Sequence, residues 1–529
     1  MTLAAFFLHG YHLGVEDSEI YLPAIKKLIH PQLYPFAPEF FLSHGHLSLF
    51  SPLIAGTAFV TRLSADWVIL LWYVLTLYAM AIACWLTARA CFDSTRARWG
   101  AVLLAMAVLT MPATNTGLLL MDPYLTARSM STPLTLFALA SLLERKYARA
   151  SVATAMTAVV HPQMVVYLLF LMAVILVHRR VRSRVLEPAP AMASFALILP
   201  SGFRLGPATG AYREALFSRD YFFLSTWTWY HWLGMLAPLA ILAFFWRSRL
   251  RNTTDGFACL SFAMLPFGVL AILSAGVLSS SNIFEMFARL QPLRSFHLIT
   301  LVFVLLLGGA VGEYCTGKRR WAGVSALVVI AVGMGISDSM LYSASPHVEW
   351  PAKHSENAWV NTLLWIRTHT PENAVFAVDS RYFLAPGVDE HGFRAISERS
   401  ALADYYKDSG VVSLFPSLAP EWKQMSDATQ GLNHFSFADF KRLETEYPEV
   451  NWTVIRGHAP AGLECPYAHE GYTVCKLPAM GAGEVSADTA NSPVRTGPHA
   501  SQNAPHKMPT VLRQPILFWQ NRIGTSEPC

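Results

Sequence analysis

Apolar runs as long as a bilayer is thick recur along this chain of 529 residues. A helix needs roughly 20 apolar residues to cross the hydrocarbon core. In lipid every backbone polar group must find a partner within the protein, so such runs predict helices. We expect clear membrane-spanning helices at 66–88, 99–120, 124–143, 230–246, 256–277, 296–314 and 321–341.

Four further runs are irregular. The run 148–177 is interrupted by His161-Pro162, and a proline inside a helix removes a backbone hydrogen bond, so we expect two half-helices that enter and return. A shorter span is expected near 190–201, the first run (1–13) is short for a span, and 47–63 is expected to be re-entrant or to lie flat. The prediction is a mainly α, polytopic membrane protein with about 11 segments, including the broken hairpin.

Short basic clusters separate these runs and predict the orientation. All of them fall on one side if 148–177 forms a hairpin, and the positive-inside rule makes that side cytoplasmic. The clusters are Arg89/Arg96/Arg98, Arg145/Lys146/Arg149, Arg179/Arg180/Arg182/Arg184, Arg247/Arg249/Arg251 and Lys318/Arg319/Arg320. Because the net charge of +5 is held in this pattern, no nucleic-acid partner is expected.

The chain changes character after residue 341. We expect a transmembrane domain over 1–341, with a first outer loop at 14–65, and an extracytoplasmic α/β domain over 342–479. Helices are predicted at 359–370, 419–429 and 437–447, and strands at 374–378, 452–455 and 472–477. Cys465 and Cys475 are expected on the outer side, where a disulfide can form between them. Residues 480–529 are rich in Pro, Ala, Ser and Gly and are predicted to be disordered.

Three carboxylates, those of Glu16, Asp17 and Glu19, lie within four residues just after the first apolar run. One of them is a candidate general base, or two of them, with Asp122, are candidate ligands for a divalent cation such as magnesium or manganese. The alternative is helix capping plus solvated charge, since acidic residues favour helix N-termini. An interfacial amphipathic helix with Pro23 in its first turn is expected to follow the acids.

Basic side chains on the predicted outer side are candidate ligands for phosphate. Arg128 lies inside an apolar run, and Arg289 and Arg294 break the positive-inside pattern. Guanidinium groups match phosphate in a two-pronged fork, although any one of these arginines is also explained by snorkelling to lipid headgroups. His161, at the helix break, is a candidate to hydrogen-bond phosphate or sugar, with packing as its alternative. No Walker loop, dinucleotide fingerprint or nucleophile elbow gives a basis for ATP or NAD use.

Together these motifs resemble the GT-C class of integral-membrane glycosyltransferases, which carry acidic catalytic residues in the first outer loop. The resemblance rests mainly on Glu16-Asp17-Ser18-Glu19 and covers roughly residues 1–480. It is supported by short stretches that also resemble the class: Tyr124-Leu125-Thr126-Ala127-Arg128-Ser129, His161-Pro162, Gln291-Pro292-Leu293-Arg294, and Trp365 to Phe376. The best-known members have an Asp-x-Asp or Asp-Asp pair where this chain has Glu-Asp-Ser-Glu, so the identity of the base stays open.

The resemblance implies transfer of a sugar from a polyprenyl-phosphate donor to an acceptor on the extracytoplasmic face of a bacterial inner membrane. Asp17 is our first choice for the base and Glu16 the second, while Arg128 and Arg294 would stabilise the departing phosphate, with or without a cation. The other predicted substrate contacts are Glu19, His161 and Arg289. A transporter of lipid-linked saccharides and a non-catalytic membrane assembly protein are the alternatives. A cavity that is shared by Asp17, Arg128 and Arg294 and open to the bilayer would favour the transferase, whereas an Asp17 that faces bulk water alone would favour the assembly protein.

Overall fold

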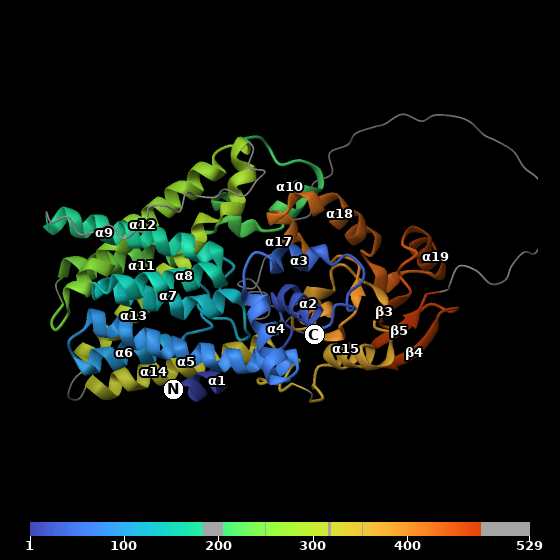
Figure 1. The fold of residues 1–529 in the computed structure, drawn as a ribbon, viewed down its shortest axis with the longest axis horizontal. Coiled ribbons are helices and arrows are strands. Elements are labelled where there is room, and N and C mark those ends of the chain that lie inside the picture. Colours follow the sequence, from blue (N-terminus) through green and yellow to red (C-terminus); the bar gives the residue numbers. More distant parts are fainter. Residues whose placement is uncertain (184–204, 249, 316–318, 352, 478–529) are drawn as a thin grey trace, which may run out of the picture. The chain divides into compact units, whose positions relative to one another are not determined.

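The computed structural model describes residues 1–183, 205–248, 250–315, 319–351 and 353–477. Six of the helices in these ranges are long and apolar enough to cross a membrane, so the chain is a membrane protein, with fewer spans than the roughly 11 segments predicted. Figure 1 shows these long helices beside one another. They are α5 (Ala65–Cys91), α9 (Pro162–Ser183), α11 (Trp229–Ser248), α12 (Asp255–Ser279), α13 (Phe296–Tyr314) and α14 (Arg319–Leu341).

Three predicted membrane segments are shorter than a span. The helices α6 (Thr95–Ala107), α7 (Ala127–Leu143) and α8 (Tyr147–Val160) have 13, 17 and 14 residues. At ~1.5 Å per residue, a helix as short as α6 covers only about 20 Å of a core that is ~30 Å thick. The predicted span 99–120 is therefore wrong beyond Ala107, because the chain turns back on itself where Pro112 pairs with Leu119. The predicted span 190–201 lies outside the described residues.

The predicted break at His161 separates α8 from α9, and the two helices run in opposite directions. Near the end of α9, Arg179 donates hydrogen bonds to the carbonyls of Leu142 (2.8 Å) and Leu143 (3.0 Å), where α7 ends. Since α8 begins four residues after α7 ends, α9 returns to the side from which α8 started. The hairpin was predicted, but its second arm has 22 residues and is itself long enough to span.

The basic clusters in the described residues meet at one end of the helices. Arg89 pairs with Glu144 at 2.9 Å, which joins the loops after α5 and α7. The Thr254 hydroxyl donates to the Ala90 carbonyl, and Asn252 donates to Glu313 at the end of α13. The loops that carry the arginine-rich turns therefore lie together, as the predicted layout requires.

Four shorter helices precede α5: α1 (Thr2–His9), α2 (Ser18–Ile29), α3 (Glu39–Gly45) and α4 (Phe50–Thr61). With 12 residues, α4 is too short to cross a bilayer, in line with the expectation for 47–63. The expectation for α2 was wrong in two respects. The helix begins at Ser18, so Pro23 lies inside it and Glu19 in its first turn. It is also buried rather than interfacial.

Ion pairs explain why a helix with two lysines can be buried. Lys26 lies 3.1 Å from Asp66 of α5 and 2.9 Å from Glu398, and Arg367 lies 3.1 Å and 2.7 Å from the same two carboxylates. The alternating charges link the N-terminal helices to the C-terminal region. Residues 1–477 accordingly form one compact unit.

The C-terminal region is built around a five-stranded sheet with strand order β2-β1-β3-β5-β4. The strand β1 (Val375–Val378) is parallel to β2 (Ser400–Ala401) and to the central strand β3 (Trp452–Arg456), whereas β5 (Tyr472–Lys476) is antiparallel to β3 and to β4 (Glu464–His469). The helices here are α15 (Ala358–His369), α16 (Phe393–Ser397), α17 (Lys407–Leu414), α18 (Ala419–Ala428) and α19 (Phe437–Glu446). The sequence predicted α15, α18, α19, β1, β3 and β5. It missed β2, β4, α16 and α17.

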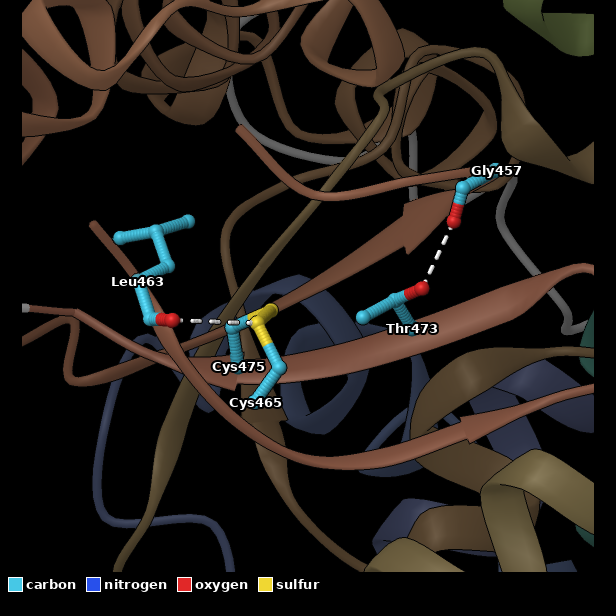
Figure 2. Close-up of a disulfide and its surroundings, with 5 residues drawn as sticks. All are labelled: Gly457, Leu463, Cys465, Thr473 and Cys475. Carbon is cyan, nitrogen blue, oxygen red and sulfur yellow. Dashed lines mark hydrogen bonds between the residues drawn. A yellow bond between two sulfur atoms is a disulfide. The ribbon is translucent and has the colours of Figure 1, made fainter. Parts of the chain in front are cut away.

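The β4–β5 hairpin at the edge of this sheet holds a disulfide. Cys465 and Cys475 are joined, as the sequence suggested, at a sequence separation of 10. Figure 2 shows the bond beside the hydrogen bond from the Thr473 hydroxyl to the Gly457 carbonyl. The disulfide adds a covalent link to an edge hairpin that is also held by its backbone ladder and by the ion pair between Lys476 and Glu464 at 2.6 Å. The predicted disordered tail, 480–529, lies outside the described residues.

Candidate functional site

A cavity of about 830 Å³, counting the space at its opening, lies between the ends of the helices opposite the basic loops and the C-terminal region. Its lining includes four residues that the sequence singled out, each from a different segment: Asp17, Arg128, His161 and Arg294. Their convergence is one half of the condition set for favouring the transferase; the other half is that the cavity opens to the bilayer.

Asp17 is the N-cap residue of α2, but its side chain makes no capping hydrogen bond. The Asp17 backbone carbonyl accepts from the amide of Tyr21 at 3.2 Å, whereas the carboxylate faces the cavity and is 43% exposed. Helix capping, one part of the alternative considered for this acid, therefore does not apply, while the exposure of the carboxylate fits the other part, a solvated charge. The carboxylate is available to a ligand.

Arg128 is held in position by Asp122. Its Nη2 atom donates to both Asp122 oxygens at 2.6 Å, and Asp122 also accepts from the hydroxyls of Thr126 (3.0 Å) and Ser129 (2.9 Å). Thr126 in turn caps α7, because its hydroxyl accepts from the Ser129 amide. The capping residues at the start of α7 thus fix the arginine at the cavity wall.

His161 and Arg294 come from two other breaks in helical structure. His161 ends α8, and its Nδ1 atom accepts from the amide of Met164 at 3.3 Å. Arg294 lies in the short 3₁₀ turn Pro292–Ser295 that precedes α13. Its Nη2 atom donates to the Tyr221 hydroxyl at 3.1 Å, and its guanidinium lies over the same ring. Interrupted helices therefore supply polar groups at the level of the cavity.

The C-terminal region contributes Lys407, which no sequence pattern singled out. It is the first residue of α17, its side chain is only 7% exposed, and its ammonium contacts Glu16 and lies 3.4 Å from Asp17. Burial lowers the pKa of Lys407 to about 7. The two carboxylates oppose that effect because they favour the charged form. Glu16 therefore acts on the cavity through Lys407.

A buried cluster of charges positions both Asp17 and Lys407. Arg394 Nε donates to Glu19 at 2.9 Å, and its Nη2 atom donates to Asp408 at 2.6 Å and lies 3.4 Å from Asp404. Glu19 lies two residues after Asp17, and Asp408 directly follows Lys407. One guanidinium thus joins the two segments that carry the acid and the ammonium.

Three predicted site residues are placed elsewhere. Glu19 was expected to contact substrate, but its carboxylate is 1% exposed and also accepts from the backbone amides of Arg394 and Ala395, so it has a structural role. Arg289 does not line the cavity; it packs against α17, with Nη1 3.4 Å from the Leu414 carbonyl. Glu16 is not in the cavity lining either, and reaches it only through Lys407.

The predicted cation site has no matching geometry. Asp122 is paired with Arg128 and Glu16 with Lys407, so two of the three proposed ligands already face a positive charge. No group of three or more His, Cys, Asp or Glu side chains suited to a metal occurs in the described ranges. These residues do not fit a divalent cation, and the chemistry below uses none.

The electrostatics of the cavity favour an anion. Its lining contains four cations, Arg128, Arg219, Arg294 and Lys407, against the carboxylate of Asp17; Asp122 and Glu16, outside the lining, pair with Arg128 and Lys407 and leave one cation in excess. Within the described part of the chain, buried nitrogens of three of these arginines and of His44 have no hydrogen-bond partner: Arg128 Nη1, Arg219 Nε, Arg294 Nε and His44 Nδ1. Leaving a buried donor unpaired costs about 1–3 kcal/mol, more for a charged group, and an anionic ligand would remove that cost.

No model of a known protein family matches the sequence, and no curated protein is significantly similar to it. The function must therefore be argued from the site itself.

Proposed function

We propose that this protein is a membrane glycosyltransferase that moves a sugar from a polyprenyl-phosphate donor to an acceptor hydroxyl. The observation that carries the proposal is the shared cavity, in which one exposed carboxylate faces three arginines and a lysine. A general base and a phosphate-binding group are the two parts that such a displacement needs. A binding protein for lipid-linked phosphates would need the arginines but not the carboxylate.

In the proposed reaction, Asp17 accepts the proton of the acceptor hydroxyl. The acceptor oxygen then forms a bond to the anomeric carbon, and the bond from that carbon to the phosphate oxygen breaks, so the configuration inverts. The phosphate leaves with the electron pair, and Arg128 and Arg294 stabilise its charge. Asp122 supports this step because it orients Arg128 through the 2.6 Å contacts and leaves Nη1 for the ligand.

We place the cavity and the C-terminal region on the extracytoplasmic face of a bacterial inner membrane. The basic loops lie at the opposite end of the helices, and the positive-inside rule assigns that end to the cytoplasm. The Cys465–Cys475 disulfide supports the same side, because disulfides persist in oxidising compartments.

The test is sugar transfer by the purified protein in lipid nanodiscs, with polyprenyl phosphates carrying labelled sugars as donors and a panel of saccharide and lipid acceptors. We expect transfer by the parent and a loss of roughly 100-fold or more in D17N, the size of a general-base contribution. Asp93→Asn is the matched control, because Asp93 is exposed at the basic end of the helices.

Binding and transfer are measured on the same samples. R294Q is expected to weaken binding of the polyprenyl phosphate, whereas D17N is expected to leave it nearly unchanged. If the parent binds the lipid phosphate tightly but transfers no sugar from any donor, the transporter or assembly protein replaces the transferase. Equal transfer by D17N and the parent would remove Asp17 from the mechanism.

A further inference from the structure

A second group of polar side chains at the cavity carries no charge. Gln163 lies in the first turn of α9, Gln291 directly precedes the short turn Pro292–Ser295, and both line the cavity. Tyr167, one turn further along α9, is hydrogen-bonded to both of them. We call Gln163, Tyr167 and Gln291 the amide cluster. The cluster lies where the break between α8 and α9 meets the turn before α13, and the proposed reaction leaves it without a role.

Hydrogen bonds fix the direction in which each amide of the cluster points. The Tyr167 hydroxyl donates to the backbone carbonyl of Gln291 at 2.8 Å, so its oxygen accepts from Gln163. Gln163 Nε2 donates to that oxygen at 3.0 Å and to Gln291 Oε1 at 3.4 Å. A carboxamide has two N–H donors and one carbonyl oxygen. Both donors of Gln163 are therefore used, whereas Gln163 Oε1 and Gln291 Nε2 have no hydrogen-bond partner within the described ranges.

The backbone holds Gln291 in this place. Gln291 has a left-handed conformation (φ 52°), which is uncommon outside glycine and is kept only where its surroundings enforce it. Its amide donates to the Ala288 carbonyl at 2.9 Å, and its carbonyl accepts from the Arg294 amide at 3.0 Å as well as from Tyr167. Gln291 is thus joined directly to a proposed phosphate-binding residue. A group esterified to a phosphate at Arg294 is within reach of the amide cluster.

We propose that Gln163 and Gln291 form a subsite for two adjacent hydroxyls of a neutral saccharide. A hydroxyl both donates and accepts, so one of the pair donates to Gln163 Oε1 while the other accepts from Gln291 Nε2. A neutral sugar fits because the phosphodiester of the donor already balances the one cation in excess at the cavity. The inference rests on the proposed function and names the class of sugar that it uses. The hydroxyls belong to the donor sugar or to a saccharide acceptor, and two arms of the test separate these sources.

The first arm measures what the sugar adds to binding, without any transfer. The full chain in nanodiscs is titrated with short-chain prenyl phosphodiesters of glucose, mannose and galactose, and with the prenyl methyl phosphodiester, which has the same charge but no sugar. One neutral hydrogen bond contributes roughly 2- to 10-fold in affinity, so the best glycosyl diester should bind about 10-fold more tightly than the methyl diester. Q163L and Q291L should each lower this ratio by roughly 2- to 10-fold and leave the affinity for the methyl diester unchanged.

The second arm tests the acceptor as the source of the hydroxyls. Methyl glucoside, mannoside and galactoside are titrated into nanodiscs that are saturated with the prenyl methyl phosphodiester. A glycoside whose affinity falls in Q163L and Q291L assigns the subsite to the acceptor, whereas a fall in the ratio of the first arm assigns it to the donor. Gln424→Leu is the matched control in both arms, because Gln424 is exposed on α18, and it should change neither. Tighter binding of a glucuronosyl diester than of every neutral one overturns the neutral class.

Two precautions separate recognition of a sugar from a structural role. Q163N and Q291N keep the amide but shorten its reach by one methylene, so they should show the same loss, and they replace the leucine variants if those do not fold. A purely structural role would lower the affinities for the methyl and glycosyl diesters by the same factor, and that result overturns the inference. So does a parent that gains no affinity from any sugar in either arm, or a gain that the variants retain. A sugar-dependent affinity that the variants lose, in a protein that transfers no sugar, supports the subsite and refutes the transferase instead.

Discussion

Replacement of Arg394 by methionine should destabilise the whole described unit, because one guanidinium neutralises three buried carboxylates. The side chains of Glu19, Asp404 and Asp408 are 1%, 4% and 0% exposed, and each has an oxygen within 3.4 Å of an Arg394 nitrogen. Breaking a buried ion pair by removing one partner costs about 3–5 kcal/mol, since the remaining charge stays buried. For a unit of 477 residues this corresponds to a fall of roughly 3–5 °C in the unfolding midpoint.

The loss should also depend on pH in a defined direction. Burial raises the pKa of Glu19 and of Asp404 even with Arg394 in place, and without Arg394 both are harder still to ionise in the folded state, so the destabilisation is largest near neutral pH and shrinks as the pH falls and they bind protons. Thermal unfolding in nanodiscs at a fixed scan rate, between pH 5 and 8, measures both effects. Arg442→Met is the control, because Arg442 is 70% exposed in its pair with Asp439 and exposed pairs contribute little. Equal midpoints for R394M and R442M would refute the reasoning.

Three other predictions follow from single contacts. Burial raises the pKa of Glu349, but the imidazole of His391 outweighs burial and lowers that pKa to about 2. The loss of stability in E349Q should therefore be largest between pH 4.5, above which Glu is ionised in the unfolded state, and the raised pKa of His391. A fall in the unfolding midpoint that is the same at every pH contradicts this. Gly410→Ala should weaken binding of a polyprenyl phosphate several-fold without lowering the unfolding midpoint, because an added Cβ would lie 2.6 Å from Arg219 Nη2 and displace the guanidinium. Gly276→Ala is the control, because the space around its added Cβ is open and neither the affinity nor the midpoint should change. Equal affinities of the two variants for the polyprenyl phosphate would count against a role for Arg219. Reduction of the disulfide should destabilise the β4–β5 hairpin by ~3 kcal/mol at most and speed hydrogen exchange of its amides, while the affinity of the cavity for a polyprenyl phosphate stays the same. A loss of that affinity would show that the hairpin supports the site.

Local signals in the sequence determined most of the element types. The apolar runs predicted five of the six long helices as spans and the sixth, α9, as one half of a hairpin, and Pro162 marked the break that separates α8 from α9. These features are encoded within stretches of about 20 residues, where hydrophobicity and backbone preference act directly. The same stretches misled where apolar residues lie in a turn, as between Pro112 and Leu119, because hydropathy does not report backbone direction.

The site was predictable only in part for the same reason. Asp17, Arg128 and Arg294 stood out because charges are rare beside apolar runs, whether or not their partners are known. Glu19 stood out equally, yet it turned inward to Arg394, and Lys407 carried no local signal at all. The sequence by itself determined which segments are helical and which charges are unusual. Only the tertiary structure decided which of those charges meet, since a partner 390 residues away is set by packing and by no pattern within the segment.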